Sequence, residues 1–155
     1  MNITALSLIV ISLFLLLTAS CAGQLSKQKK APGTADERLQ SCPDKPNCIN
    51  TEYPDRISQY MPALDYPKQK EEQVMVIAKD IIVKMGGQII AEESHYLAAT
   101  FTSSFFRFVD DFEIRRNETS TKLHIRSASR VGYSDFGVNK QRVEKFSDNF
   151  KAKIY

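Results

Sequence analysis

The spacing of apolar residues changes along the chain, and this change limits the folds that the chain can adopt. Across residues 105–115, apolar and polar side chains alternate, which is the pattern of a half-buried strand. Residues 68–85 and 139–154 instead repeat apolar side chains every three or four positions, as amphipathic helices do. Shorter strand-like runs occupy residues 88–92, 95–103 and 122–129. We therefore predict an α+β fold, a four-stranded antiparallel sheet with two helices packed on one face.

The last two predicted strands are joined by a short polar connection that is typical of a hairpin, residues 117–120. A four-residue loop there would place Ile114 opposite Leu123, so that apolar side chains share one face of the sheet. The same register would place Asp111 opposite Arg126, as an ion pair.

The first 20 residues hold 14 apolar side chains and no charged one. Their apolar run is shorter than the roughly 20 residues that span a bilayer as a helix, so we predict an export signal. Small residues at positions 18–20 precede Cys21, an order that resembles a bacterial lipoprotein signal, in which the Cys is lipidated. Ala22 rather than Asp follows Cys21, and in lipoproteins of Gram-negative bacteria this resemblance implies sorting to the outer membrane, facing the periplasm. The alternatives are plain secretion, with cleavage near Ser20, and an uncleaved anchor.

We predict that the rest of the chain divides into a flexible polar tether, residues 21–38, and one domain, residues 39–155. Twenty-one Lys and Arg stand against 18 Asp and Glu, giving a formal charge of +3. Proteins that bind nucleic acid concentrate basic residues on one face. No such concentration is present in this sequence, so we expect no nucleic-acid partner.

Five of the six prolines lie within residues 42–67, which predicts an extended segment before the first helix. This segment contains Cys42 and Cys48, an even pair that favours a disulfide in an oxidising compartment. Redox-active pairs normally have two intervening residues rather than five. A zinc site would need further Cys or His nearby. Free thiols and a metal site are the alternatives to the disulfide.

Polar side chains are densest in residues 110–113 and 126–139, which hairpin pairing would bring together. The candidate binding residues there are Asp110, Asp111, Arg126, Ser127, Ser129, Arg130, Tyr133, Asp135 and Asn139. Three interpretations compete: structural ion pairs, a pocket for an anionic ligand, and catalysis. The sequence points to no catalytic residue, metal ligand or cofactor, since it has two histidines and no Gly-x-Ser-x-Gly motif.

Three motifs carry a resemblance to a known family: Cys-Pro…Pro-Asn-Cys at 42–48, Phe-Val-Asp-Asp-Phe-Glu at 108–113, and Arg-Ser-Ala-Ser-Arg-Val-Gly-Tyr-Ser-Asp-Phe-Gly-Val-Asn at 126–139. They resemble the family called domain of unknown function 1499, from about residue 39 to 153. Members are exported or membrane-associated bacterial proteins and chloroplast lumenal proteins. The resemblance implies a fold and a site region but no reaction. Asn50 departs from it, since serine is common at that position.

We therefore expect an exported, lipid-anchored envelope protein that acts as a non-catalytic accessory or binding module. The alternative is an envelope enzyme that uses the Asp/Arg/Ser cluster of residues 110–139. Expected partners are the membrane, through the N-terminal lipid, and an anionic small molecule or an envelope protein. A concave pocket holding Asp110, Arg130 and Tyr133 would favour binding or catalysis. Complete pairing of these side chains beneath the surface would favour a structural role.

Overall fold

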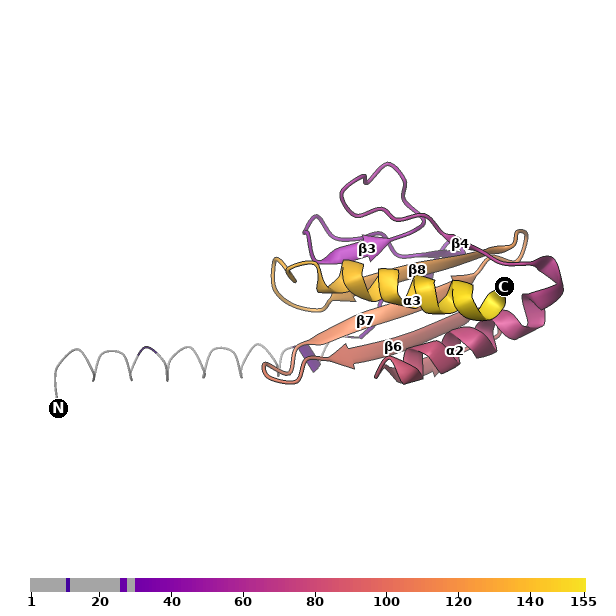
Figure 1. Cartoon of the computed structure of the whole chain (residues 1–155). Helices are drawn as coiled ribbons and strands as arrows, with labels where there is room; N and C mark the ends of the chain where they lie inside the picture. Colours follow the sequence, from indigo (N-terminus) through magenta and orange to yellow (C-terminus); the bar gives the residue numbers. More distant parts are fainter. Residues whose placement is uncertain (1–10, 12–25, 28–29) are drawn as a thin grey trace.

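The computed structural model describes residues 11, 26–27 and 30–155 (Figure 1). Apart from Ile11, the predicted signal peptide lies outside these residues, and so does Cys21. Within the described part of the chain, no helix has the length and apolar character needed to cross a membrane.

Four successive strands pair antiparallel and form most of the sheet: β5 (Gln88–Glu92), β6 (Tyr96–Thr102), β7 (Val109–Arg116) and β8 (Lys122–Ser129). Two short strands, β3 (Cys48–Asn50) and β4 (Leu64–Asp65), pair antiparallel with the other edge of β8. The sheet thus has six strands, and the prediction of four is wrong. The Pro-rich segment supplies the other two, because its proline-free stretches hydrogen-bond to an edge that would otherwise be unpaired.

The hairpin register differs from the prediction by two residues. Ile114 pairs with Ile125, and Glu113 with Arg126, because the four-residue loop occupies residues 118–121. The predicted pairing of Asp111 with Arg126 is therefore wrong. A shift of two keeps every side chain on its face, so the predicted division into an apolar and a polar face is correct.

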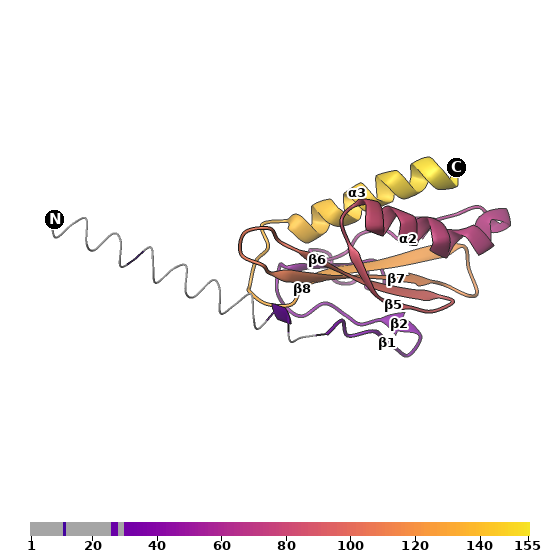
Figure 2. The ribbon, with the colours of Figure 1, turned by 90° about the horizontal axis from the view of Figure 1, so that it is seen from below.

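Two helices cover one face of the sheet (Figure 2). A 3-10 turn, η1 (Lys68–Gln73), leads into α2 (Val74–Lys84), and α3 (Val138–Ile154) ends the chain beside it. The predicted pair of helices on one face is thus confirmed. Gly86 ends α2 with a φ of 91°, a left-handed conformation that glycine adopts without strain.

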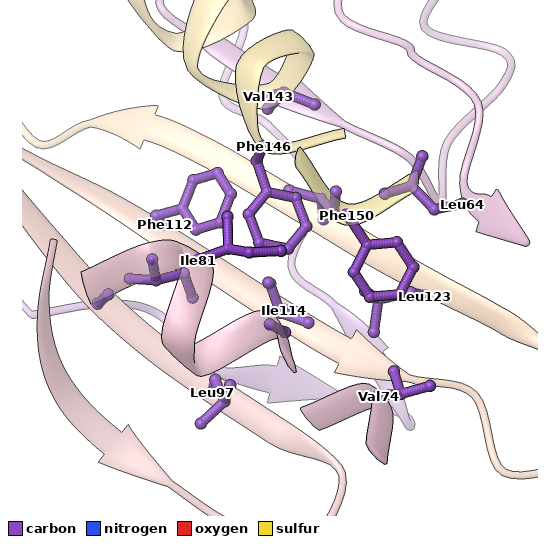
Figure 3. Packing of buried hydrophobic residues seen from close by; sticks show 14 of the residues in the cluster. Leu64, Val74, Ile81, Leu97, Phe112, Ile114, Leu123, Val143, Phe146 and Phe150 are labelled. Carbon is purple, nitrogen blue, oxygen red and sulfur yellow. The ribbon is translucent and has the colours of Figure 1, made fainter. Parts of the chain in front are cut away.

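The hydrophobic core lies between these helices and the sheet (Figure 3). Phe112 and Ile114 of β7 contribute to it from below, and Phe146 and Phe150 of α3 from above. The rings of Phe112 and Phe146 lie 5.3 Å apart. Each of these side chains is fully buried, which stabilises the fold by about 2 kcal/mol per side chain relative to exposure.

The N-terminal part of the described chain lies on the opposite face (Figure 2). There β1 (Thr34–Ala35) and β2 (Arg38–Leu39) form a small hairpin, and Leu39 is fully buried. Ser26 is also fully buried, against the start of β7. Part of the predicted tether thus contacts the sheet. The flexibility of the tether and the domain boundary at residue 39 remain predictions.

Candidate functional site

The polar residues singled out in the sequence divide between the two faces of the sheet. On the helix face, Asp110 accepts a hydrogen bond of 2.8 Å from the Arg142 guanidinium. The same guanidinium donates to Asn139 Oδ1 (2.6 Å) and Ser127 Oγ (3.2 Å), and it lies 4.7 Å from the centre of the Phe101 ring. Arg142 thus neutralises a shielded carboxylate and links α3 to the sheet.

Asn139 is the centre of this network, and it is almost completely buried. Its side-chain amide donates to Asp135 Oδ2 (2.8 Å), Ser129 Oγ (3.0 Å) and the Asn47 carbonyl oxygen (3.2 Å). Asp135 in turn accepts hydrogen bonds from the backbone N–H groups of Gly137 and Asn139, at the start of α3. Five of the candidate residues therefore fix the junction between α3, β8 and the segment before β3.

On the opposite face, Arg130 donates three hydrogen bonds of 2.7 to 3.1 Å to the Asp111 carboxylate. Its remaining nitrogen donates to the Ser26 carbonyl oxygen at 3.3 Å. Both side chains are almost completely shielded from solvent. Arg130 is thus engaged by a buried acid and by the N-terminal segment that covers it.

Glu113 and Arg126 form a second buried pair on this face, with an Nη1 to Oε2 distance of 2.7 Å. The Tyr96 hydroxyl and the Gly33 backbone N–H both donate to Glu113 Oε1. Burial raises the pKa of Glu113, and the Arg126 guanidinium opposes that change. Burial also raises the pKa of Tyr96, with the Glu113 charge adding to the effect.

The candidate residues therefore pair beneath the surface instead of lining a common pocket. Asp110 and Asp111 point to opposite faces, and Arg126 and Arg130 are each held by a carboxylate. Tyr133 is the exception, with 70% of its surface exposed. This geometry favours the structural interpretation of the cluster over an anion pocket.

A different concave surface lies on the face of the sheet opposite the helices. It is a cleft of about 1000 Å³ between the β1–β2 hairpin and the ends of β6, β7 and β8. None of the nine candidate residues lines it. Both histidines of the chain, His95 and His124, do so, together with Arg115 and Arg116.

Glu52 forms the floor of this cleft and is almost completely buried. Its carboxylate accepts a hydrogen bond from Arg115 Nε (3.0 Å) and lies 3.6 Å from His124 Nδ1. Thr51 Oγ1 lies 3.4 Å from the same nitrogen. Burial lowers the pKa of His124, and the Glu52 charge opposes that change.

The rim of the cleft is acidic. Six carboxylates and four cationic side chains line the cleft as a whole: Asp36, Glu37, Glu52, Asp65, Glu93 and Glu118, against Arg38, Arg115, Arg116 and Lys122. Arg115 pairs with Glu52, and Lys122 with Asp65 at 2.7 Å. Three exposed acids at the rim, Asp36, Glu37 and Glu93, have no ion-pair partner among the residues that the structure describes. The cleft thus offers negative charge to solvent.

The family profile described as "Protein of unknown function (DUF1499)" matches residues 38–150. The chain belongs to the DUF1499 family. This establishes the resemblance predicted from the three motifs. No curated protein matches the chain.

The predicted disulfide is confirmed in this DUF1499 domain, where Cys42 and Cys48 are bonded. The closed loop holds Asn47 against the end of β8, and its carbonyl oxygen accepts a hydrogen bond from the Ser129 N–H (3.0 Å). Over residues 11, 26–27 and 30–155, no group of three or more His, Cys, Asp or Glu side chains is arranged to hold a metal ion.

The candidate residues predicted from the sequence leave out four polar residues of the DUF1499 domain: Glu52, Arg115, His124 and Arg142. Arg142 had a usable signal, because it lies three residues after Asn139 and therefore on the same side of α3. Arg115 and His124 pair directly across β7 and β8, but only the correct register shows this. Glu52 had no signal, since it lies in the Pro-rich segment far from both in sequence.

Proposed function

We propose that this chain is a lipid-anchored protein of the cell envelope that acts as a non-catalytic binding module. The leader with Cys21 supports export and lipidation, and a disulfide suits an oxidising compartment outside the cytoplasm. The module binds its partner in the acidic cleft beneath the β1–β2 hairpin.

The partner proposed here is a basic segment of an envelope protein. The acidic rim carries this proposal, because Asp36, Glu37 and Glu93 are exposed and would attract Lys or Arg side chains. An anionic small molecule has less support, since Arg126 and Arg130 already pair with buried carboxylates. Freeing either arginine would leave an unpaired buried acid, which is costly.

The enzyme alternative also has less support. It needs Asp110, Asp111, Arg126 and Arg130 to face one substrate, whereas Asp110 points to the face opposite the other three. In the cleft, Thr51 and Glu52 both approach Nδ1 of His124. A nucleophile–base–acid relay would need one partner at each ring nitrogen.

Photo-crosslinking in cells tests the proposed partner site. A photo-reactive phenylalanine analogue is placed at Thr119, which lines the cleft, or at Lys145, which is exposed on α3. A defined protein adduct should form from position 119 and not from 145. Adding Glu37→Lys and Glu93→Lys should abolish the adduct, because the rim becomes basic. Equal adducts from both positions, or an adduct that survives the charge reversal, would contradict the proposal.

Labelling with radioactive palmitate tests the anchor separately. The wild-type chain should take up label and fractionate with membranes, and Cys21→Ser should do neither. An unlabelled wild-type chain would rule out the lipid anchor without affecting the proposed role of the cleft.

A further inference from the structure

Exposed aromatic side chains gather at one end of the molecule. The β6–β7 loop carries Phe105 and Phe106, with exposed fractions of 75% and 45%. The loop between β8 and α3 carries Tyr133 and Phe136, with exposed fractions of 70% and 92%. Asp110, next to the first loop, pairs with Ser129, the last residue of β8. Both loops therefore lie at the same end of the sheet (Figure 1, Figure 2).

The rings of the first loop pack on one another rather than in the core. The ring centres of Phe105 and Phe106 are 4.8 Å apart, and those of Phe106 and Phe108 are 5.7 Å apart. Exposed apolar patches of this kind mark surfaces that contact a partner or a membrane. The tip residues Arg107 and Phe136 both have φ near +55°, a conformation that residues other than glycine seldom adopt.

The N-terminal segment is fixed at this same end. Ser26 Oγ accepts a hydrogen bond from the Val109 N–H (2.7 Å) and donates one to the Val109 carbonyl oxygen (3.1 Å). Val109 directly follows the aromatic loop. Cys21 precedes Ser26 by five residues, which span at most about 17 Å when extended. A lipid on Cys21 would therefore hold the aromatic loops close to the bilayer surface.

We propose that the end formed by residues 103–108 and 131–138 docks on the membrane, with its aromatic rings in the interfacial layer of the bilayer. The proposal rests on the lipid anchor proposed above. Tyr is enriched at this depth, and Phe is typical of apolar surfaces that insert between the headgroups and the acyl chains. Two exposed cations belong to the same end: Arg107 follows Phe106 in the loop, and Lys27 follows Ser26, which is bonded to Val109. Anionic headgroups would attract them. The lipid and the loops then act together, as two attachments bind more firmly than one.

This arrangement fixes the orientation of the domain. The C-terminus, the end of α3 and the start of α2 lie at the far end from the aromatic loops (Figure 1). The β7–β8 loop, which borders the acidic cleft, also lies at that far end, because it joins the opposite ends of the two strands. The cleft would therefore open away from the bilayer and face the aqueous compartment.

Tryptophan fluorescence tests the docking, since the chain contains no Trp of its own. The full lipidated chain, with Phe106→Trp or Phe136→Trp, is placed in vesicles of phosphatidylethanolamine and phosphatidylglycerol. Part of the lipid carries bromine on its acyl chains, which quenches a nearby indole. The control is Tyr155→Trp, an exposed aromatic position at the other end. Quenching should be at least about fivefold stronger at 106 and 136 than at 155.

A charge variant strengthens the test. Adding Phe105→Asp to the Phe136→Trp protein should at least halve the quenching at position 136, because a carboxylate resists entry into the interface. All proteins are first shown to carry palmitate, so the anchor is verified independently. Equal quenching at 136 and 155 in the palmitate-labelled protein would overturn the docking and leave the anchor intact. An unlabelled protein would remove the anchor and this inference with it.

Discussion

Glu113 and Arg126 lie directly opposite each other on β7 and β8 and form an ion pair beneath the β1–β2 hairpin. The Glu113 side chain has no exposed surface, and that of Arg126 is 7% exposed. The pair therefore fixes the register of the hairpin, since a slip by two residues would leave two charges buried without partners.

Replacing Arg126 with Met should reduce the free energy of unfolding at pH 7 by about 3 kcal/mol, because Glu113 would be left without its cation. Urea unfolding followed by circular dichroism measures this loss. Burial already raises the pKa of Glu113, and losing Arg126 would raise it further. The folded variant then binds a proton that the unfolded chain releases at neutral pH. Its stability deficit should therefore shrink as the pH falls toward the ordinary carboxyl value.

The matched control is the double variant Arg126→Met with Glu113→Gln, which leaves no buried charge. It should regain more than half of the lost stability at pH 7. If the single and double variants are equally unstable, the charge pair does not account for the loss.

Arg142→Met should lower the free energy of unfolding by about 2 kcal/mol, because Asp110 and Asn139 each lose a charged hydrogen-bond donor. Thermal or urea unfolding measures the effect. Arg107→Met is the control, since this exposed side chain should change stability by less than about 0.5 kcal/mol. Similar losses in both variants would show that the hydrogen bonds of Arg142 do not account for the change in the free energy of unfolding.

Stability should fall in mildly acidic solution through His124. Burial lowers the pKa of His124 below its ordinary value of 6.5, so the unfolded chain takes up a proton at a higher pH than the folded chain. The stabilising contribution is therefore complete above pH 6.5 and is lost as the pH falls through the folded pKa. Urea unfolding at pH 7.5 and 5.5 should show a smaller pH dependence for His124→Gln than for the wild type. A His124→Gln variant with the same pH dependence as the wild type would contradict this prediction.

Replacing both Cys42 and Cys48 with Ser should lower the free energy of unfolding by about 2 kcal/mol, the value expected for so short a closed loop. Under reducing conditions the wild type should unfold like this variant. Cys21→Ser serves as the control and should unfold like the wild type under oxidising conditions.

The sequence predicted the two faces of the sheet correctly because burial imposes a period of two on each strand, and that period is local. It did not predict the register, since Ile114 faces the core whether it pairs with Leu123 or Ile125. Shifting the β7–β8 register by two residues leaves every apolar side chain on the same face of the sheet. The position of the turn therefore decides between the two pairings.

The short strands β3 and β4 could not be predicted, because their own residues carry no strand pattern. They are extended because they hydrogen-bond to β8. Each has two or three residues within a Pro-rich segment, and both hydrogen-bond to β8. The candidate site shows the same dependence on tertiary structure. Asp110 is among the candidate residues predicted from the sequence, but its partner, Arg142, is set by how α3 packs on the sheet. The cleft draws its residues from four separate parts of the chain.

Cys42 and Cys48 are six residues apart, whereas Cys48 pairs with Ala128 near the other end of the chain. If the chain is exported N-terminus first, as proposed, both cysteines reach an oxidising compartment long before β8 does. Closing a short loop costs little entropy, so the cross-link can form early, while the long-range strand pairing has to wait. Folding of this domain would then begin with a covalent loop at one end and finish when the last strand docks against it.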